Sequence, residues 1–161
     1  MTILTEFMDQ VPQPAPTHVF LQAGVGSFSG ALAAYLTHLY PNNCPRIVVV
    51  EAREADCIWR SAEAGDGEMR SVGGSMETIM AGLCCGVPSV QGWPILRATS
   101  TTFLSCEDSV TRRGMRILYS PLPGDERVVS GNNKYHDTVL CGHGHVQESQ
   151  ELCAWELSTP S

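Results

Sequence analysis

A glycine-rich turn is the part of this sequence whose residue types and spacing best suit chemistry. Residues 17–36, THVFLQAGVGSFSGALAAYL, pass from an apolar β-rich segment through two closely spaced glycines into a segment with helical alternation. At such a turn, backbone N–H groups and the positive end of the helix dipole favour an anion, most often phosphate. Glycine lets the backbone approach the ligand and adopt a positive φ. The sequence therefore predicts a phosphate site, with a tight turn that binds no ligand as the alternative.

One candidate ligand of this turn is a dinucleotide. Gly24, Gly26 and Gly30 form a GxGxxxG pattern, one residue longer than the dinucleotide-binding fingerprint. Glu51, at the end of the next apolar segment, lies where an acid that binds a ribose is expected. An NAD-binding half-domain is therefore one hypothesis, although a helical segment and a proline-rich connector precede the first strand.

Few other side chains suggest chemistry. Lys134 is the only lysine of the 161 residues, and it lies in a polar segment where a solvated surface lysine is expected. Cys141, His143 and His145, in CGHGH, are residue types that bind zinc, but this alternating spacing through glycines is not typical of a zinc site. We therefore expect no metal site and assign no catalytic residue.

Composition excludes several classes of protein. A net charge of −7 with only 10 Lys plus Arg argues against nucleic acid as a partner. No apolar run approaches the roughly 18 residues of a membrane span, and the first residues lack the basic and apolar parts of a secretory signal. The seven cysteines show no CxxC pair and are expected to be reduced. A soluble, cytoplasmic protein is expected.

The elements around the glycine turn form a βαβ unit. Apolar spacing predicts a helix over residues 2–11, followed by short buried strands over 18–23 and 45–52. Between these strands, Ser27 or Ser29 is expected to cap a helix that ends near Pro41. Such a crossover favours parallel strands with helices on the faces, so the sequence predicts an α/β fold.

The alternation of elements continues to about residue 120. We expect helices at 54–63, 76–86, 91–100 and 106–120, a polar loop at 65–74 and a strand at 101–105. The 76–86 helix is expected to be short and buried, and the last helix has Val110, Met115, Ile117 and Leu118 available for burial. Periodicity is lost after Gly131. The domain is therefore expected over residues 1–131, with a divergent and poorly ordered tail over 132–161.

Several stretches, in order, resemble one enzyme family. They include PTHVFLQAGVGSFSGALAAYL, IVVVEAREADCIWRS, VGGSMETIMAGLCCGVPS, GWPIL, FLSCEDSV, GMRIL and ERVVSG. Together they resemble the C-terminal half of the diaminopropionate ammonia-lyases, a pyridoxal-phosphate-dependent family of the tryptophan-synthase-β-like group. The resemblance covers residues 1–131. It implies a partial open parallel sheet with flanking helices, like the large domain of fold-type II pyridoxal-phosphate enzymes.

The resemblance also implies a cofactor site. The residues that match the family's phosphate-binding loop are Ala23, Gly24, Val25, Gly26 and Ser27. Gly82 matches the segment beside the cofactor ring, and Ser130 matches a turn near the ring nitrogen. Ser75 and Ala52 depart from the family pattern, where Asp and Pro are expected.

The family's reaction is the α,β-elimination of 2,3-diaminopropionate to pyruvate and ammonia. Its Schiff-base lysine and base carboxylates precede the glycine loop, so the resemblance implies that this chain is a truncated form, inactive alone. A non-catalytic interaction fragment is a further alternative. The expected partners are a small amino-acid substrate in the full-length family, and a second copy in a homodimer or a chain that associates with an exposed sheet edge.

Overall fold

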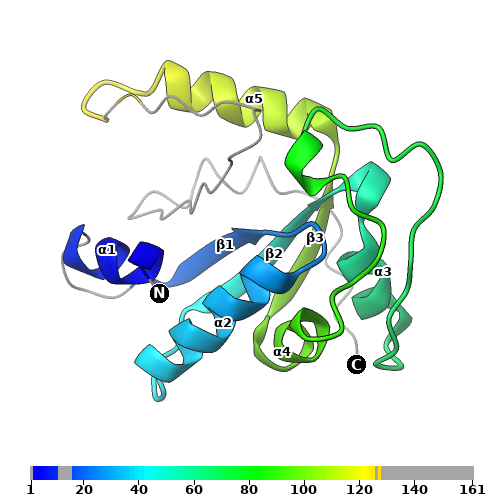
Figure 1. Ribbon diagram of the computed structural model, residues 1–161. Coiled ribbons are helices and arrows are strands. Elements are labelled where there is room, and N and C mark those ends of the chain that lie inside the picture. Colours follow the sequence, from blue (N-terminus) through cyan, green and yellow to red (C-terminus); the bar gives the residue numbers. More distant parts are fainter. Residues whose placement is uncertain (1, 11–15, 126, 128–161) are drawn as a thin grey trace.

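The computed structural model describes residues 2–10, 16–125 and 127 (Figure 1). The elements in these ranges are α1 (Thr2–Gln10), β1 (His18–Gln22), α2 (Ser27–Leu39), β2 (Arg46–Ala52), the 3₁₀ turn η1 (Arg53–Ala55), α3 (Cys57–Ala64), the 3₁₀ turn η2 (Ala81–Leu83), α4 (Gly92–Thr99), β3 (Thr102–Cys106) and α5 (Asp108–Tyr119). No helix in the described ranges is long and apolar enough to cross a membrane.

A three-stranded parallel sheet organises the fold. The strand order is β1-β2-β3, and both neighbouring pairs are parallel. In the register, Leu21 of β1 lies opposite Val49 of β2, which lies opposite Phe103 of β3. Parallel neighbours require crossover connections, and these contain α2 and α4. The predicted α/β fold with an open parallel sheet is therefore confirmed.

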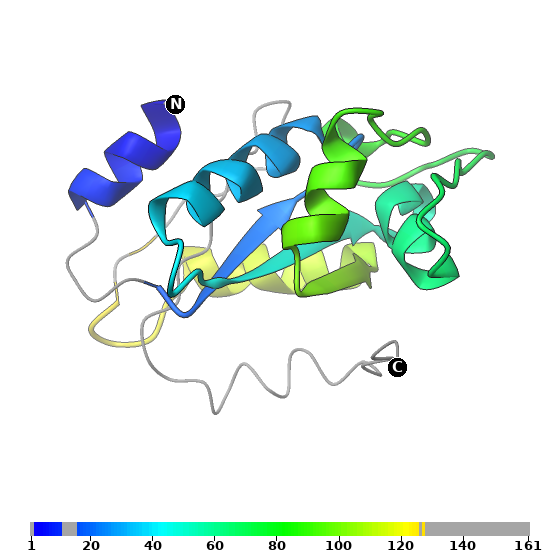
Figure 2. The ribbon, with the colours of Figure 1, turned by 90° about the horizontal axis from the view of Figure 1, so that it is seen from below.

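Helices α2 and α4 lie side by side over one face of the sheet (Figures 1 and 2). Two glycines allow this close approach. A Cβ atom added to Gly30 would lie 3.1 Å from Gly92 Cα, and one added to Gly92 would lie only 2.4 Å from the Gly26 carbonyl oxygen. Because backbone atoms are the neighbours, no rotation of a side chain relieves such a contact. The start of α4 therefore packs directly against the glycine turn that precedes α2.

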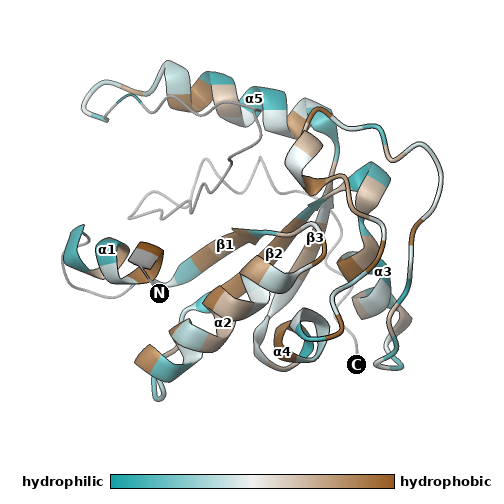
Figure 3. Ribbon diagram, in the orientation of Figure 1, coloured by the Kyte–Doolittle hydropathy of each residue, from teal (hydrophilic) through white to brown (hydrophobic). Residues whose placement is uncertain are grey.

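The hydrophobic core lies between this helix layer and the sheet. Strands β1 and β2 are nearly continuous apolar runs and α2 is largely apolar, as Figure 3 shows by colour. The buried cluster contains Leu4, Val19, Leu21, Ala23, Leu32, Ala33, Leu36, Ile47, Val49, Cys57, Ile58, Trp93 and Leu96. It thus draws on α1 to α4, β1 and β2, with Phe103 of β3 packed against it.

The last helix does not bury the residues that its sequence made available. Helix α5 has no buried residue, and Ile117 is 44% exposed. Figure 1 shows α5 beginning beyond the carboxyl end of β3 and running along the top of the view, apart from α2 and α4. Val110, Met115 and Leu118 are half-buried and Ile117 is exposed, so none of the four residues available for burial is fully buried among the described residues.

Two local predictions are also wrong. Residues 76–86 form no buried helix, and only η2 is helical within them. The Thr78 hydroxyl and the Ile79 N–H donate to the Asp108 carboxylate instead of to a helical turn. In addition, neither Ser27 nor Ser29 caps α2, because the N-cap residue is Gly26 and no side chain caps it.

Glu51 fixes the start of α3 from the end of β2. Its carboxyl group is 1% exposed and accepts hydrogen bonds from the Ile58 N–H at 2.9 Å and the Trp59 N–H at 2.5 Å. Burial raises the pKa of Glu51 to about 8, although the two N–H groups act in the opposite direction. A buried carboxyl group thus stabilises a helix start that carries no side-chain cap from its own N-cap residue.

Ser29 offers a first test of the packing. Its hydroxyl is fully buried and has no hydrogen-bond partner among the described residues. We expect Ser29→Ala to raise the free energy of unfolding by about 1 kcal/mol, because it removes a buried polar group without a partner and favours the helix. Denaturant titration measures the change.

The matched control is Ser61→Ala. The Ser61 hydroxyl donates to the Cys57 carbonyl at 2.6 Å and accepts the Arg70 N–H at 2.8 Å, so its loss is expected to cost about 1–2 kcal/mol. Equal destabilisation by the Ser29 and Ser61 substitutions would contradict the assignment of Ser29.

Glu51 gives a prediction of pH dependence. Between the ordinary carboxyl pKa of 4.5 and about 8, the native state retains a proton that the unfolded state has lost. The Glu51 contribution to the free energy of unfolding therefore falls as pH rises through this window, by at most about 1.4 kcal/mol per pH unit, and levels off above it.

Denaturant titrations across this pH window measure the slope. Glu51→Gln is expected to remove this part of the slope, whereas Glu63→Gln, at an exposed position of α3, retains Glu51 and the slope. Identical slopes in Glu51→Gln and the unaltered chain would show that Glu51 is not protonated in the native state.

Candidate functional site

The glycine turn joins the end of β1 to the start of α2. The Ala23 N–H donates to the Val50 carbonyl at 2.9 Å and so extends the pairing of the two strands by one residue. Gly26 then takes a φ of +86°, a left-handed conformation that favours glycine, and becomes the N-cap of α2. Gly24 has no positive φ. Of the two glycines, only Gly26 uses this freedom.

Hydrogen bonding leaves the amides of the turn available. The Gly24 carbonyl accepts from the Cys57 thiol, the Val25 carbonyl from the Ser89 N–H at 2.7 Å, and the Gly26 carbonyl from the Gly30 N–H at 2.9 Å. Within the described ranges, the N–H groups of Gly24, Val25 and Gly26 donate to no other group. Three amide donors beside the positive end of α2 form the geometry that an anion requires.

The turn lies partly at the surface. Val25, Ser27 and Phe28 are exposed, whereas Ala23 and Gly26 are buried. The carbonyl groups of the turn are thus hydrogen-bonded to neighbouring segments, while Val25 and Ser27 are exposed. The anion site at Ala23–Ser27 therefore stays a prediction, and its ligand is proposed below.

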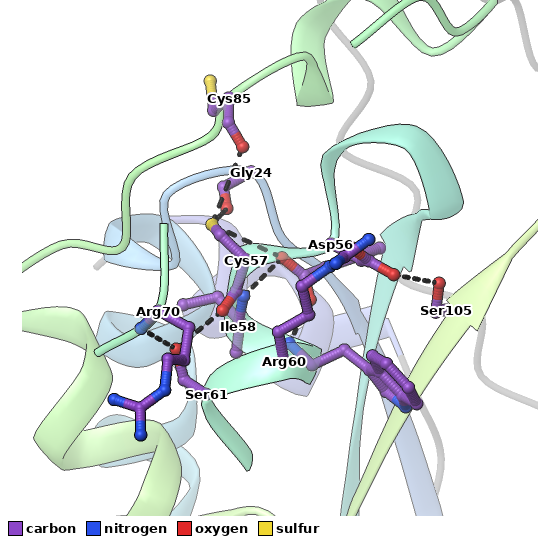
Figure 4. Close-up of polar contacts among 11 residues, drawn as sticks. Gly24, Asp56, Cys57, Ile58, Arg60, Ser61, Arg70, Cys85 and Ser105 are labelled. Carbon is purple, nitrogen blue, oxygen red and sulfur yellow. Dashed lines mark hydrogen bonds and ion pairs between the residues drawn. The ribbon is translucent and has the colours of Figure 1, made fainter. Parts of the chain in front are cut away.

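A second segment lies against this turn. A Cβ atom added to Gly24 would lie 3.4 Å from Cys85 Sγ and 3.5 Å from Leu83 Cα. The Cys57 sulfur lies 3.6 Å from both the Gly24 and Cys85 carbonyl oxygens, which joins the two segments (Figure 4). Burial, together with the nearby Glu51 carboxyl group, raises the pKa of Cys57 to about 12, so its thiol remains a hydrogen-bond donor. Gly82, in the same segment, is exposed.

Glu51 of β2 and Ser105 of β3 fix the start of α3, Glu51 through backbone N–H groups and Ser105 through the N-cap residue Asp56. Asp56 accepts the Ser105 hydroxyl at 2.8 Å and the Arg60 Nε at 2.7 Å, and it is only 3% exposed (Figure 4). These contacts fix the helix that carries Cys57 relative to the sheet. The thiol that contacts the glycine turn is therefore positioned by strands β2 and β3.

Glu51 does not have the role of a ribose-binding acid that the dinucleotide-binding pattern suggested. Its carboxyl group is buried beneath α3, with both oxygens bound to backbone N–H groups. It is therefore not presented to a ribose, and the interpretation of Glu51 as a ribose-binding acid is wrong. The raised pKa of this side chain has a structural cause.

Sequence reasoning did not identify the role of Asp108. One carboxylate oxygen accepts the Thr78 hydroxyl at 2.6 Å, and the other accepts the Ile79 N–H at 3.0 Å. Burial raises the pKa of Asp108, but these two hydrogen bonds and the charge of Arg112 outweigh it and hold that pKa below its usual range. No local sequence signal links residues thirty positions apart.

Several candidate residues lie outside the described ranges. These are Ser130, the lysine Lys134, the possible zinc ligands Cys141, His143 and His145, and the whole 132–161 segment. Among the described residues, no cluster of His, Cys, Asp or Glu has the geometry of a metal site.

Comparison with known proteins identifies the family. Residues 1–124 match the model of the family described as pyridoxal-phosphate dependent enzyme. The chain is 43% identical over 137 residues to diaminopropionate ammonia-lyase of Salmonella typhimurium and 46% identical over 134 residues to that of Escherichia coli K12. These alignments cover 83% and 82% of this chain but 34% and 33% of the relatives.

A solved structure agrees with the sequence relatives. The holo form of diaminopropionate ammonia-lyase from Escherichia coli superimposes with a TM-score of 0.67 and 43% identity, over 81% of this chain and 31% of that one. The chain thus spans about a third of the length of its relatives, less than the half expected from sequence, and the predicted likeness to fold-type II enzymes is confirmed. From its glycine turn to α5, this chain belongs to the family of pyridoxal-phosphate-dependent enzymes.

Proposed function

We propose that this chain is the cofactor-binding part of a pyridoxal-phosphate-dependent ammonia-lyase. The reaction is the α,β-elimination of 2,3-diaminopropionate to pyruvate and ammonia. The observation that carries the proposal is the glycine turn, where three amides without an acceptor in the described structure stand beside the start of α2. Relatives 43–46% identical, which are named diaminopropionate ammonia-lyases, support this choice of reaction.

The phosphate group of the cofactor is assigned to the turn. The proposed ligands are the backbone amides of Gly24, Val25 and Gly26, with Ala23 and Ser27 at either end. Gly82 is assigned to the ring side of the site because its segment packs against Gly24. Ser130 completes the proposed set. When bound, pyridoxal phosphate supplies the electron sink for the elimination.

The chain's own residues account for binding rather than turnover. The only lysine, Lys134, lies beyond the residues that match the family. We therefore propose that the 161 residues hold the cofactor, and that the cofactor-bearing lysine and the base come from further polypeptide. On this proposal the chain alone does not convert the amino-acid substrate.

The alternatives are weaker. An NAD-binding module would need an acid facing the ribose, and Glu51 is buried under α3. Association, either as a homodimer or through a sheet edge, remains part of the proposal and is supported by the exposed Ile117, Tyr119 and Leu122 at the end of α5 and beyond it. A cytoplasmic location is likewise proposed, and the free cysteines of the described residues are compatible with it.

Gly24→Asp tests the assignment of the turn. The added Cβ meets only ordinary contacts at 3.4–3.5 Å, but the carboxylate stands beside the proposed phosphate. We expect the affinity for pyridoxal phosphate to fall at least about tenfold through charge repulsion. Equilibrium dialysis with pyridoxal phosphate measures the change, and thermal unfolding shows whether the variant is folded.

The control carries the same charge elsewhere. Gly73→Asp has open space around its Cβ and no positive φ, so its affinity is expected to match that of the unaltered chain. Gly24→Ala separates the steric from the electrostatic effect. Unchanged affinity in Gly24→Asp would rule out the phosphate assignment.

Borohydride treatment tests the division between binding and turnover. With pyridoxal phosphate present, we expect no stoichiometric adduct on Lys134 and no release of pyruvate from 2,3-diaminopropionate. Intact mass, peptide mapping and a pyruvate assay measure these outcomes. A stoichiometric adduct on Lys134 together with turnover would overturn the proposal that the chain alone is inactive.

A further inference from the structure

Asp108 makes contacts that do not stabilise its own helix, α5. As the first residue of α5, it already benefits from the helix dipole. Its two carboxylate oxygens are nonetheless occupied by the Thr78 hydroxyl at 2.6 Å and the Ile79 N–H at 3.0 Å. The same turn of α5 adds the Thr111 hydroxyl, 3.1 Å from Met80 Sδ. The start of α5 therefore holds residues 78–80 through three contacts.

The held residues continue directly into the segment beside the glycine turn. The Leu83 N–H donates to the Met80 carbonyl at 2.8 Å and the Cys84 N–H to the Ala81 carbonyl at 3.4 Å, which forms η2. Leu83 and Cys85 then approach Gly24. A short chain of backbone hydrogen bonds thus connects the Asp108 carboxylate with one wall of the anion site.

We infer that Asp108 is a positioning residue that, through Thr78 and Ile79, holds the 81–85 segment against the glycine turn and so shapes the proposed cofactor site. The identity of the ligand in this inference rests on the proposed function, whereas the contacts of Asp108 are independent of that function. The phosphate donors belong to residues 24–26, whereas the 81–85 segment borders the turn beside Gly24. Loss of Asp108 is therefore expected to affect the part of the ligand beyond the phosphate.

This expectation separates positioning from simple stabilisation of the fold. Asp108→Ala and the near-isosteric Thr78→Val each remove the hydrogen bond between the two side chains. We expect each substitution to lower the affinity for pyridoxal phosphate about tenfold and the affinity for inorganic phosphate less than twofold. Thr78→Ser retains the hydroxyl and is expected to keep the affinity of the unaltered chain for both probes.

Glu107→Ala is the matched control. Glu107 precedes Asp108, is exposed, and pairs with Arg53 rather than with residues 78–80. Titration of the full chain with each probe, read by calorimetry or amide chemical shifts, is expected to show no change in this variant. The inference would be overturned if Asp108→Ala lowered the affinity for both probes equally, or left both affinities unchanged. Loss of affinity in Thr78→Ser would also overturn it.

Amide hydrogen exchange without ligand tests the contact independently of the proposed function. Residues 78–85 are expected to exchange at least about tenfold faster in Asp108→Ala, with α2 unchanged and Glu107→Ala like the unaltered chain. If the unaltered chain binds no pyridoxal phosphate, the proposed function and the role of Asp108 in cofactor binding both fail. Equal exchange of residues 78–85 in the unaltered chain and Asp108→Ala would overturn the holding role itself.

Discussion

Close contact between two backbones, at the glycine turn and at the start of α4, is the constraint on which the site depends. The position of a Cβ on Gly92 lies 2.4 Å from the Gly26 carbonyl oxygen, so a side chain there would force the helices apart. This contact holds the Gly26 carbonyl against the start of α4, while the Gly26 backbone has a positive φ. The N–H groups of Gly24, Val25 and Gly26 are left without an acceptor among the described residues. Helix packing and anion binding are therefore two consequences of the same small residues.

The two faces of the sheet differ in how far helices cover them. One face of the sheet packs against α2 and α4, and the core lies there. On the other face Phe20, Val50 and Leu104 are only partly buried, and α5 buries none of its residues. These surfaces are the least covered among the described residues of a chain that spans about a third of the length of its relatives. The glycine turn, by contrast, is supported entirely by described residues.

Local patterns in the sequence predicted most of the fold, because strands β1 and β2 are nearly continuous apolar runs and α2 and α4 have helical spacing. The predictions failed where distant partners decide the structure. Residues 76–86 carry a helical pattern, yet Asp108 takes the Thr78 hydroxyl and the Ile79 N–H. Glu51 had the position of a ligand-binding acid but supports α3. For the site, the glycine spacing predicted the turn, whereas the packing of residues 81–85 on it needed the structure.

The central claim is that this turn binds the phosphate of pyridoxal phosphate through backbone amides. A crystal structure of the chain with pyridoxal phosphate tests it most directly. The account predicts phosphate oxygens within about 2.7–3.2 Å of the amide nitrogens of Gly24, Val25 and Gly26. Pyridoxal phosphate bound at another place, with the turn unchanged and its amides without a ligand, would contradict it.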